Sequence, residues 1–264
     1  MNSAGGPRVF LTGASSGIGA ALAKAYANRG ATLGLTARRA EPLQQLASSL
    51  AVPSAVYPLD VRDGEALRVA AEDFIARFGP PDIVIANAGV GAGTLTEHPE
   101  DLPVFKEILD VNVLGMLYTF HPFVTAMRAR AAGRLVGIAS VAGFRGMPGT
   151  GAYSASKAAA IAYLEALRVE LRGSGVGVTT ICPGYVATPL TARNPYPMPF
   201  IMTAEDAARR MLSAIDAGKS HRSLADGCHR ILAAPASQLA VRRRLLPSRA
   251  QAAARLTGDR YLVL

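Results

Sequence analysis

Tyr153 and Lys157 are the two residues of this chain whose spacing points most directly to chemistry, because they stand four positions apart in Tyr-Ser-Ala-Ser-Lys. Positions i and i+4 of a helix share one face, so the phenol and the ammonium group can reach the same cleft. A phenol has a reference pKa of about 10, and a fixed cation nearby lowers that pKa. The pair suits proton transfer during interconversion of a carbonyl and an alcohol. The same spacing also occurs by chance on solvated helices, so the interpretation depends on the rest of the chain.

A glycine-rich segment near the amino terminus predicts a nucleotide site. Residues 8–11 form an expected buried strand, Thr-Gly-Ala-Ser-Ser-Gly-Ile-Gly follows at 12–19, and an alanine-rich helix is expected over 20–28, with Gly30 ending it. Glycines let the backbone turn and approach a pyrophosphate closely, and the N–H groups at a helix start receive the anion. An ordinary glycine turn before a helix is the alternative, but it does not need so long a string. The residues expected to bind are Gly13, Ser15, Ser16, Gly17, Ile18 and Gly19.

The next expected strand, Thr32–Ala37, ends in Arg38 and Arg39. An acidic residue about twenty positions after the glycine motif binds the ribose 2′-hydroxyl of NAD, whereas an Arg there accommodates the 2′-phosphate of NADP. No Asp or Glu stands between Arg29 and Ala40. The sequence therefore predicts that NADP(H) is preferred over NAD(H). Arg38 is the expected determinant, and Arg39 is either a second contact or a solvated residue.

Further motifs follow along the chain, and with those above they resemble the short-chain dehydrogenase/reductase family of the single-domain type. The motifs are residues 12–19, Asp60-Val61, Asn87-Ala88-Gly89, Asn112, Ser140, Tyr153-x-x-x-Lys157, and Pro183-Gly184 through Thr188. The resemblance implies one doubly wound α/β domain over residues 1–264, a Rossmann fold with a parallel sheet flanked by helices. The chain length and the alternation of strand and helix patterns favour the same architecture.

The resemblance also implies the catalytic roles. Tyr153 is expected to be the general acid in reduction and the base in oxidation, and Lys157 to lower the Tyr153 pKa and bind the nicotinamide ribose. Ser140, at the end of a strand expected over 134–139, would hold the substrate oxygen; the alternative is a capping or turn serine. Asn112, in a helix expected around 110–118, would hold a water that links Lys157 to solvent. Its alternative is a helix residue whose amide points at solvent.

Other matched residues are expected to contact the cofactor. Asp60 would face the adenine ring with Val61 packed against it, although Asp60 could equally be a plain turn residue. Asn87, after the expected strand Ile83–Ala86, would brace the neighbouring strand and line the cleft. Thr188 would bind the nicotinamide carboxamide. The remaining expected cofactor contacts are Ala88, Gly89, Tyr153, Lys157, Pro183, Gly184 and Val186.

The segment 188–203 is expected to form a lid over the substrate, and its alternating prolines restrict the backbone to extended conformations. The expected substrate contacts are Ser140, Ala142, Phe144, Tyr153, Tyr185, Met198 and Phe200, some of which could instead be core residues. These side chains are mainly apolar, so we expect a hydrophobic ketone or secondary alcohol, such as an aromatic, steroid-like or long-chain compound. Arg145 and Arg193 could recognise an acidic group on the substrate or could simply be solvated.

The formal net charge of +9 is unevenly distributed. Residues 219–264 contain nine Lys or Arg and two Asp or Glu, whereas the rest of the chain is nearly balanced. Arginines spaced among Leu and Ala could form a basic amphipathic helix on an anionic membrane surface. A solvated surface helix, or one packed on a neighbouring subunit, is the alternative. Aromatic residues do not alternate with these arginines, so nucleic-acid binding is not expected.

The remaining composition favours a cytoplasmic enzyme. Residues 1–7 are short and polar before the first expected strand, so we expect no signal peptide. No apolar run reaches the roughly 18–20 residues that span a bilayer. Cys182 and Cys228 are the only cysteines, and Cys182 falls on an expected buried strand, so we expect free thiols in a reducing compartment. The four histidines are scattered, which predicts no catalytic metal.

The helices expected over 101–130 and 151–172 pair across a two-fold axis in similar enzymes, which predicts a homo-oligomer, either a dimer or a tetramer. The favoured function is an NADP-dependent carbonyl reductase or alcohol dehydrogenase. The alternative is a non-catalytic NADPH-binding or membrane-attached regulatory protein on the same fold. Among enzymes, a 3-ketoacyl-carrier-protein reductase is a further possibility, because the basic region could dock an acidic carrier.

Overall fold

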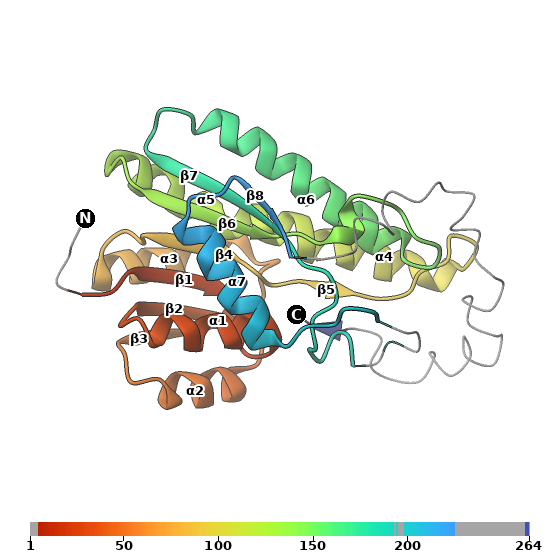
Figure 1. The fold of residues 1–264 in the computed structure, drawn as a ribbon, viewed down its shortest axis with the longest axis horizontal. Helices are drawn as coiled ribbons and strands as arrows, with labels where there is room; N and C mark the ends of the chain where they lie inside the picture. Colours follow the sequence, from red (N-terminus) through yellow and green to blue (C-terminus); the bar gives the residue numbers. More distant parts are fainter. Residues whose placement is uncertain (1–4, 193, 195–197, 225–261, 264) are drawn as a thin grey trace.

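The structure, a computed structural model, describes residues 5–192, 194, 198–224 and 262–263. A seven-stranded parallel sheet lies at its centre with helices on both faces (Figure 1), which confirms the predicted fold class. The strand order is β3-β2-β1-β4-β6-β7-β8. The strands are β1 (Arg8–Thr12), β2 (Thr32–Ala37), β3 (Ser54–Pro58), β4 (Ile83–Ala86), β6 (Gly133–Ile138), β7 (Val176–Cys182) and β8 (His221–Ser223). A separate antiparallel pair joins β5 (Val90–Gly91) to β9 (Leu262–Val263).

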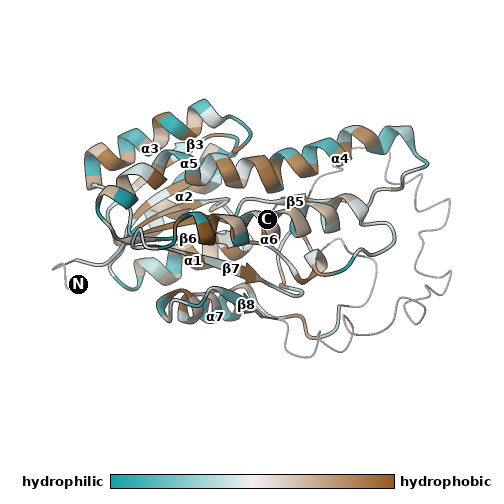
Figure 2. Cartoon of the chain, turned by 90° about the horizontal axis from the view of Figure 1, so that it is seen from above, coloured by the Kyte–Doolittle hydropathy of each residue, from teal (hydrophilic) through white to brown (hydrophobic). Residues whose placement is uncertain are grey.

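Helices cover the sheet in two layers (Figures 1 and 2). One layer contains α1 (Gly17–Ala27), α2 (Ala40–Ser49) and α7 (Ala204–Asp216). The other contains α3 (Gly64–Phe78), α4 (Leu102–Leu109), α5 (Gly115–Ala129) and α6 (Gly151–Glu170). Three short turns complete the set: 3₁₀ turns at Pro99–Asp101 and Val141–Gly143, and a π turn at Asp110–Leu114.

Strand β1 shows how the sequence builds these layers. Successive side chains of a strand point to opposite faces, and here Val9 and Leu11 enter the core under α1 while Phe10 enters the core under α3 and α5. The Phe10 ring packs on Phe74 and Phe123, with ring centroids 5.6 and 4.7 Å apart. Both faces of the strand are therefore buried, which is why its sequence is a continuous apolar run.

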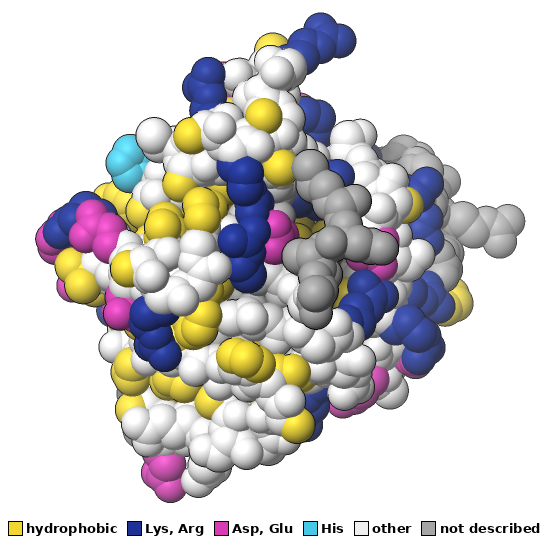
Figure 3. All heavy atoms as spheres, turned by 90° about the vertical axis from the view of Figure 1, so that its left-hand side faces the viewer, with side chains coloured by type: hydrophobic (Ala, Val, Ile, Leu, Met, Phe, Trp, Pro, Cys, Tyr) yellow, Lys and Arg dark blue, Asp and Glu magenta, His cyan; other side chains and the backbone are white. Residues whose placement is uncertain are grey.

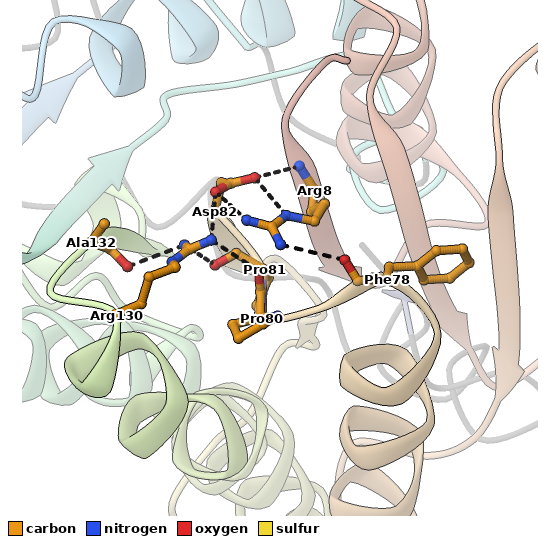
Figure 4. Close-up of polar contacts among 7 residues, drawn as sticks. All are labelled: Arg8, Phe78, Pro80, Pro81, Asp82, Arg130 and Ala132. Atoms are coloured by element: carbon orange, nitrogen blue, oxygen red, sulfur yellow. Dashed lines mark hydrogen bonds and ion pairs between the residues drawn. The ribbon is translucent and has the colours of Figure 1, made fainter. Parts of the chain in front are cut away.

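An ion cluster closes the end of the sheet at which the strands begin (Figure 4). Asp82, just before β4, accepts two side-chain hydrogen bonds of 3.0 Å from Arg8 and one of 2.8 Å from Arg130 at the end of α5. Burial raises the pKa of Asp82, but the hydrogen bonds and charges of Arg8, together with the charge of Arg130, outweigh it and hold that pKa below its usual value. Arg130 also donates to the carbonyl oxygens of Pro80, Pro81 and Ala132. The cluster thus joins β1, β4 and α5.

Figure 3 looks at the side of the molecule from which β1 starts, and it shows Lys and Arg side chains lying beside acidic and apolar ones. The ion pair between Arg29 and Asp216, at 2.8 Å, links the ends of α1 and α7. This mixture agrees with the nearly balanced charge of the residues before 219.

Some helix and strand boundaries predicted from the sequence differ from those in the structure. Helix α1 begins at Gly17 rather than at residue 20, with the extended Ser16 at its N-cap position but no hydrogen bond from the Ser16 side chain. The helix expected over 101–130 is broken by the π turn at Asp110–Leu114. Strands β1 and β6 and helix α6 differ from expectation by one or two residues at an end, which is the usual margin of such boundaries.

Candidate active site

Strand order reverses between β1 and β4, and crevices at such switch points are where doubly wound sheets bind ligands. Asn87 lies at this point, immediately after β4, and is fully buried. Its Nδ2 donates to the carbonyl oxygens of Thr12 at 3.0 Å and Gly13 at 3.2 Å. Its backbone N–H donates to Thr12 Oγ1 at 3.2 Å. The residue thereby joins the carboxyl ends of the two strands and fixes the start of the glycine-rich loop.

The glycine-rich loop packs closely against two other segments. Gly13 has φ +68° and Gly17 has φ +52°, a region that residues other than glycine rarely adopt. A Cβ at Gly13 would lie 2.8 Å from Ala88 Cα, and one at Gly17 would lie 3.0 Å from Thr188 Cγ2. Because the loop leads directly into α1, the free N–H groups of the first helical turn lie at the same place.

Arg38 and Arg39 follow β2 and are exposed, and Asp60 is half-buried nearby. Asp60 is paired with Arg62 at 2.7 Å and also accepts the Arg62 backbone N–H at 3.0 Å. Burial raises the pKa of Asp60, but its bonds to Arg62 and the charges of Arg62 and Arg38 lower it overall. These contacts are those of a turn residue. Val61 is buried and packs near Gly115 of α5.

The ammonium group of Lys157 is buried beneath Tyr153. Both residues lie on α6, and Lys157 is 1% exposed. Its Nζ lies 5.7 Å from the centroid of the Tyr153 ring and donates to the carbonyl oxygen of Ile138 at 3.0 Å. Burial lowers the pKa of Lys157 to about 8. The spacing in the sequence therefore does place a cation beside the phenol.

Ser140 stands two residues beyond β6 and is 8% exposed. Its Oγ accepts the backbone N–H of Ala142 at 3.1 Å and so caps the short turn Val141–Gly143. A hydroxyl that accepts one bond still has its own proton to donate. The capping interpretation and the substrate-binding interpretation of this serine are therefore compatible.

Asn112 lies within the π turn and is 1% exposed, so the alternative of an amide pointing at solvent is wrong. Its Oδ1 accepts the Val90 N–H at 2.8 Å, and its Nδ2 donates to the Val90 carbonyl oxygen at 2.9 Å and to Ser156 Oγ at 2.9 Å. Such π turns occur mostly as bulges within helices, often at functional sites. Here the bulge lets one side chain connect β5 with α6.

The segment expected to be a lid has its two ends bonded together. The Ala187 N–H donates to the Met202 carbonyl oxygen at 2.8 Å, and the Met202 N–H donates to the Tyr185 carbonyl oxygen at 3.1 Å. Thr191 Oγ1 donates to the Val186 carbonyl oxygen at 2.6 Å. The segment therefore leaves and returns at one point beside Thr188. Arg193 and residues 195–197, named in the expectations above, lie outside the described residues.

The expected substrate contacts differ in their surroundings. Ala142 is buried, Met198 is half-buried with the Asn194 amide donating to its sulfur at 3.4 Å, and Tyr185 is half-buried. Phe144 is 42% exposed, and its ring centroid lies 5.7 Å from that of His221. Phe200 is 66% exposed and has φ +60°. The structure thus presents aromatic side chains to solvent on two separate loops.

Some residues of this site were not foreseen from the sequence. Gly91 lies against Tyr153, Ser156 binds Asn112, and Ile138 supplies the carbonyl that binds Lys157. Ser156 stands three positions after Tyr153 on the same expected helix, so the sequence did offer a signal that it shares the face of Tyr153. A backbone carbonyl and a glycine beside a ring leave no such signal in a sequence.

Among the described residues, no group of three or more His, Cys, Asp or Glu could hold a metal ion. Within the described residues, we find no helix with the length and apolar character that crossing a membrane needs.

Cys182 is a free, buried thiol, and burial raises its pKa to about 12. Most of the basic region 219–264, with Cys228, lies outside the described residues. The other expected contacts follow the carboxyl ends of strands of the same parallel sheet: Ser15, Ile18 and Gly19 after β1, Gly89 after β4, and Pro183 and Gly184 after β7.

Comparison with known proteins identifies the family. A family model described as short chain dehydrogenase matches residues 7–197. An uncharacterised oxidoreductase of Myxococcus xanthus is 42% identical over 219 residues, which are 81% of this chain and 85% of that protein. The 11-beta-hydroxysteroid dehydrogenase 1A of Arabidopsis thaliana is 38% identical over 190 residues, which are 70% of this chain and 54% of that longer protein.

Solved structures give the same result. A short-chain dehydrogenase/reductase from Burkholderia phymatum, crystallised in complex with NAD, aligns with a TM-score of 0.80 and 26% identity. The alignment covers 88% of this chain and 93% of that one. The parallel sheet flanked by helices described above agrees with this alignment. The chain belongs to the short-chain dehydrogenase family.

Proposed function

We propose that the chain is an NADP(H)-dependent oxidoreductase that interconverts a ketone or aldehyde and an alcohol, with a hydrophobic compound as substrate. The observation that carries the proposal is the buried ammonium group of Lys157 beside the Tyr153 ring. Burying a cation is unfavourable. Its charge does serve a phenol that must pass through its anionic form. The names of the Myxococcus and Arabidopsis relatives support oxidoreductase chemistry.

The residues present fit a dinucleotide. Gly13 and Gly17 let the loop pack against Ala88 and Thr188, where a Cβ would collide, and the N–H groups of the first turn of α1 are placed for a pyrophosphate. Asn87 Oδ1 is buried and lacks a hydrogen-bond partner among the described residues. Arg38 follows β2 at the position that accommodates a 2′-phosphate. The Burkholderia structure contains NAD, so the proposed preference for NADP(H) is drawn from Arg38 and from the absence of an acidic residue between Arg29 and Ala40 in this chain.

When bound, the nicotinamide supplies or accepts the hydride. The residues of the chain supply positioning and proton transfer. The hydroxyls of Ser140 and Tyr153 stabilise negative charge on the substrate oxygen, and Tyr153 gives that oxygen its proton in reduction or removes it in oxidation. Lys157 stabilises the resulting phenolate. Asn112 holds β5 against α6 and so fixes one wall of the site.

Exposed apolar side chains support two further parts of the proposal. Phe144, Met147, Phe200 and Ile201 are all more than a third exposed on the two loops beside the site, as a hydrophobic substrate would require. Leu102 and Phe105 of α4, Leu114 and Leu117 at the start of α5, and Val169 of α6 are also exposed. Pairing of these helices between two copies of the chain would bury them, which supports a homo-oligomer.

The test measures oxidation of NADPH and NADH with a panel of hydrophobic ketones, aldehydes and 3-ketoacyl thioesters. We expect turnover with NADPH that Tyr153→Phe reduces by about 10²–10⁴-fold. Arg38→Asp should reverse the preference towards NADH, and Arg39→Asp shows whether Arg39 is a second contact or a solvated residue. Equal use of both cofactors would refute the NADP(H) preference. Tight NADPH binding without turnover of any compound would instead favour the regulatory protein.

A further inference from the structure

The carboxyl end of the chain lies beside the proposed active site. Strand β9 pairs antiparallel with β5, with Val263 opposite Val90 and Leu262 opposite Gly91. Strand β5 directly follows Asn87, Ala88 and Gly89 at the switch point of the sheet. Figure 1 shows β9 next to β5, although residues 92–261 separate the two strands in the sequence.

Strand β5 is also in contact with the phenol of Tyr153. A Cβ at Gly91 would lie 3.1 Å from Tyr153 Cδ2 and 3.4 Å from Cε2. The first distance is shorter than ordinary van der Waals contact, so any other residue at this position would push against the ring. The backbone of Gly91 is therefore the wall on which the Tyr153 ring rests.

The two edges of β5 are occupied by different partners. Asn112 takes both the N–H and the carbonyl oxygen of Val90. In an antiparallel pair, hydrogen-bonded and non-bonded residue pairs alternate. Since the polar groups of Val90 are used by Asn112, the pair that exchanges backbone bonds with β9 is Gly91 with Leu262. The residue that supports Tyr153 is thus the residue that β9 fixes.

We propose that β9 is a positioning element of the catalytic centre, which holds Tyr153 in place through Gly91. The inference rests on the proposed role of Tyr153 as the acid and base. Without β9, one edge of β5 has unpaired backbone groups and Gly91 is fixed from the Asn112 side alone. A shift of the wall moves the phenol, and small misplacements of a reacting group reduce rates strongly.

The first experiment removes the pairing. Two variants lack it: a chain that ends at residue 261, and Leu262→Pro, which has no backbone N–H to donate at that position. The controls are the full chain and Leu262→Ala, which keeps the backbone N–H. Hydrogen exchange of the peptide containing Gly91 should accelerate in the first two variants only. Their kcat should fall at least about tenfold, with the Kd for NADPH unchanged within about twofold. Unchanged exchange or unchanged kcat would overturn the proposal.

A readout independent of turnover separates this proposal from the proposed function. With 3-fluorotyrosine at position 153, the ¹⁹F resonance reports the surroundings of the ring. It should move when residues 262–264 are removed, whether or not a substrate has been found. An unmoved resonance would overturn the positioning role even in an active enzyme. The opposite result is a full-length chain that is inactive but whose ¹⁹F resonance still moves when residues 262–264 are removed. It would refute the proposed oxidoreductase function and would still establish that β9 acts on the surroundings of the Tyr153 ring.

The second experiment tests the wall itself. Gly91→Ala adds a methyl group against the Tyr153 ring, whereas Gly146→Ala adds one where no atom lies within 4 Å. We expect Gly91→Ala to lower kcat at least about tenfold and to displace the pH profile of kcat, with the KM for NADPH unchanged. Gly146→Ala should resemble the wild type. Melting temperatures of both variants show whether they fold, and a folded Gly91→Ala with normal kcat and pH profile would contradict the proposal.

Discussion

Lys157 donates from Nζ to the carbonyl oxygen of Ile138 at 3.0 Å, which ties helix α6 to the end of β6 two residues before Ser140. The bond directs the ammonium group inward, where it is almost completely buried. Burial accordingly lowers the Lys157 pKa to about 8. One interaction thus fixes the distance between the cation and the strand that carries Ser140, and it leaves the folded apoprotein with a cation that solvent does not stabilise.

This burial predicts how the stability of the apoprotein depends on pH. The folded-state pKa of Lys157, about 8, lies below the unfolded value of about 10.4. Between these two pH values the unfolded chain binds more protons, so the free energy of unfolding rises with pH. We expect Lys157→Met to lack this rise between about pH 8 and 10, as measured by thermal unfolding without cofactor.

Lys24→Met is the matched control, because Lys24 is exposed on α1. That variant should keep the wild-type dependence on pH. Identical curves for Lys157→Met and the wild type would show that the ammonium group is solvated in solution. Lys157→Met should also lose turnover, because the phenolate of Tyr153 would have no cation beside it.

Thr191 predicts a separate effect on substrate binding. Its Oγ1 donates to the Val186 carbonyl oxygen at 2.6 Å and accepts the Thr188 N–H at 3.1 Å, which closes the base of the segment 188–203. Thr191→Val keeps the shape and removes both bonds, so unfolding should become easier by about 1 kcal/mol. If the segment 188–203 covers the substrate as we propose, the KM for the ketone should rise at least about threefold, because the segment is held less firmly.

Ser174→Ala is the comparison for this variant. Ser174 Oγ makes the same two kinds of bond, to the Leu171 carbonyl oxygen at 2.6 Å and from the Val176 N–H at 3.2 Å, at the start of β7. It should lose similar stability with no change in KM. Equal KM values for Thr191→Val and Ser174→Ala would show that the segment does not act on the substrate.

The sequence predicted those parts of the fold that local patterns determine. Strands β2 (Thr32–Ala37) and β4 (Ile83–Ala86) have the expected bounds, because each is an apolar run ended by polar or charged residues. Tyr153 and Lys157 share a face because helical geometry depends on spacing alone. The order of motifs then placed Ser140 and the glycine-rich loop at one edge of the sheet.

Features that depend on distant partners were not predictable. The π turn at Asp110–Leu114 interrupts a helical pattern without any local breaker, because Asn112 gains three hydrogen bonds to β5 and α6 when the helix bulges. The pairing of Gly91 with Leu262 joins segments that lie far apart in the sequence, and a two-residue strand is too short to show a periodic pattern of apolar residues. The contacts of Asp60 with Arg62 on its own turn likewise had no signal in the sequence, and its expected place beside the adenine stays a prediction.

Gly34 of β2 predicts a defect of packing rather than of catalysis. A Cβ there would lie 2.7 Å from Phe10 Cδ2 and 2.7 Å from Phe74 Cδ2, inside a core with no room to yield. Gly34→Ala should therefore reduce the free energy of unfolding by about 1–3 kcal/mol. Adding Phe10→Leu should recover part of this loss, because the smaller side chain makes space for the methyl group. Denaturant unfolding of the two single variants and the double variant gives the coupling energy, and simple additivity would show that the two positions do not meet.

Asp82 predicts acid sensitivity at the end of the sheet remote from the active site. Arg8 and Arg130 hold the pKa of Asp82 below its unfolded value of about 3.9, despite the opposing effect of burial. A lowered folded-state pKa gives stability that is complete above about pH 4 and is lost as the pH falls through the folded-state pKa. Asp82→Asn should therefore unfold at a lower temperature than the wild type at pH 7, and this difference in melting temperature should narrow towards pH 3.

The control is Glu72→Gln, which removes one partner of the exposed pair Arg68 and Glu72 and should change the melting temperature little at either pH. If the difference in melting temperature between Asp82→Asn and the wild type stays constant with pH, the Asp82 carboxylate gains no stability from its two arginines. Arg130 would then be held in place by its hydrogen bonds to the carbonyl oxygens of residues 80, 81 and 132 alone.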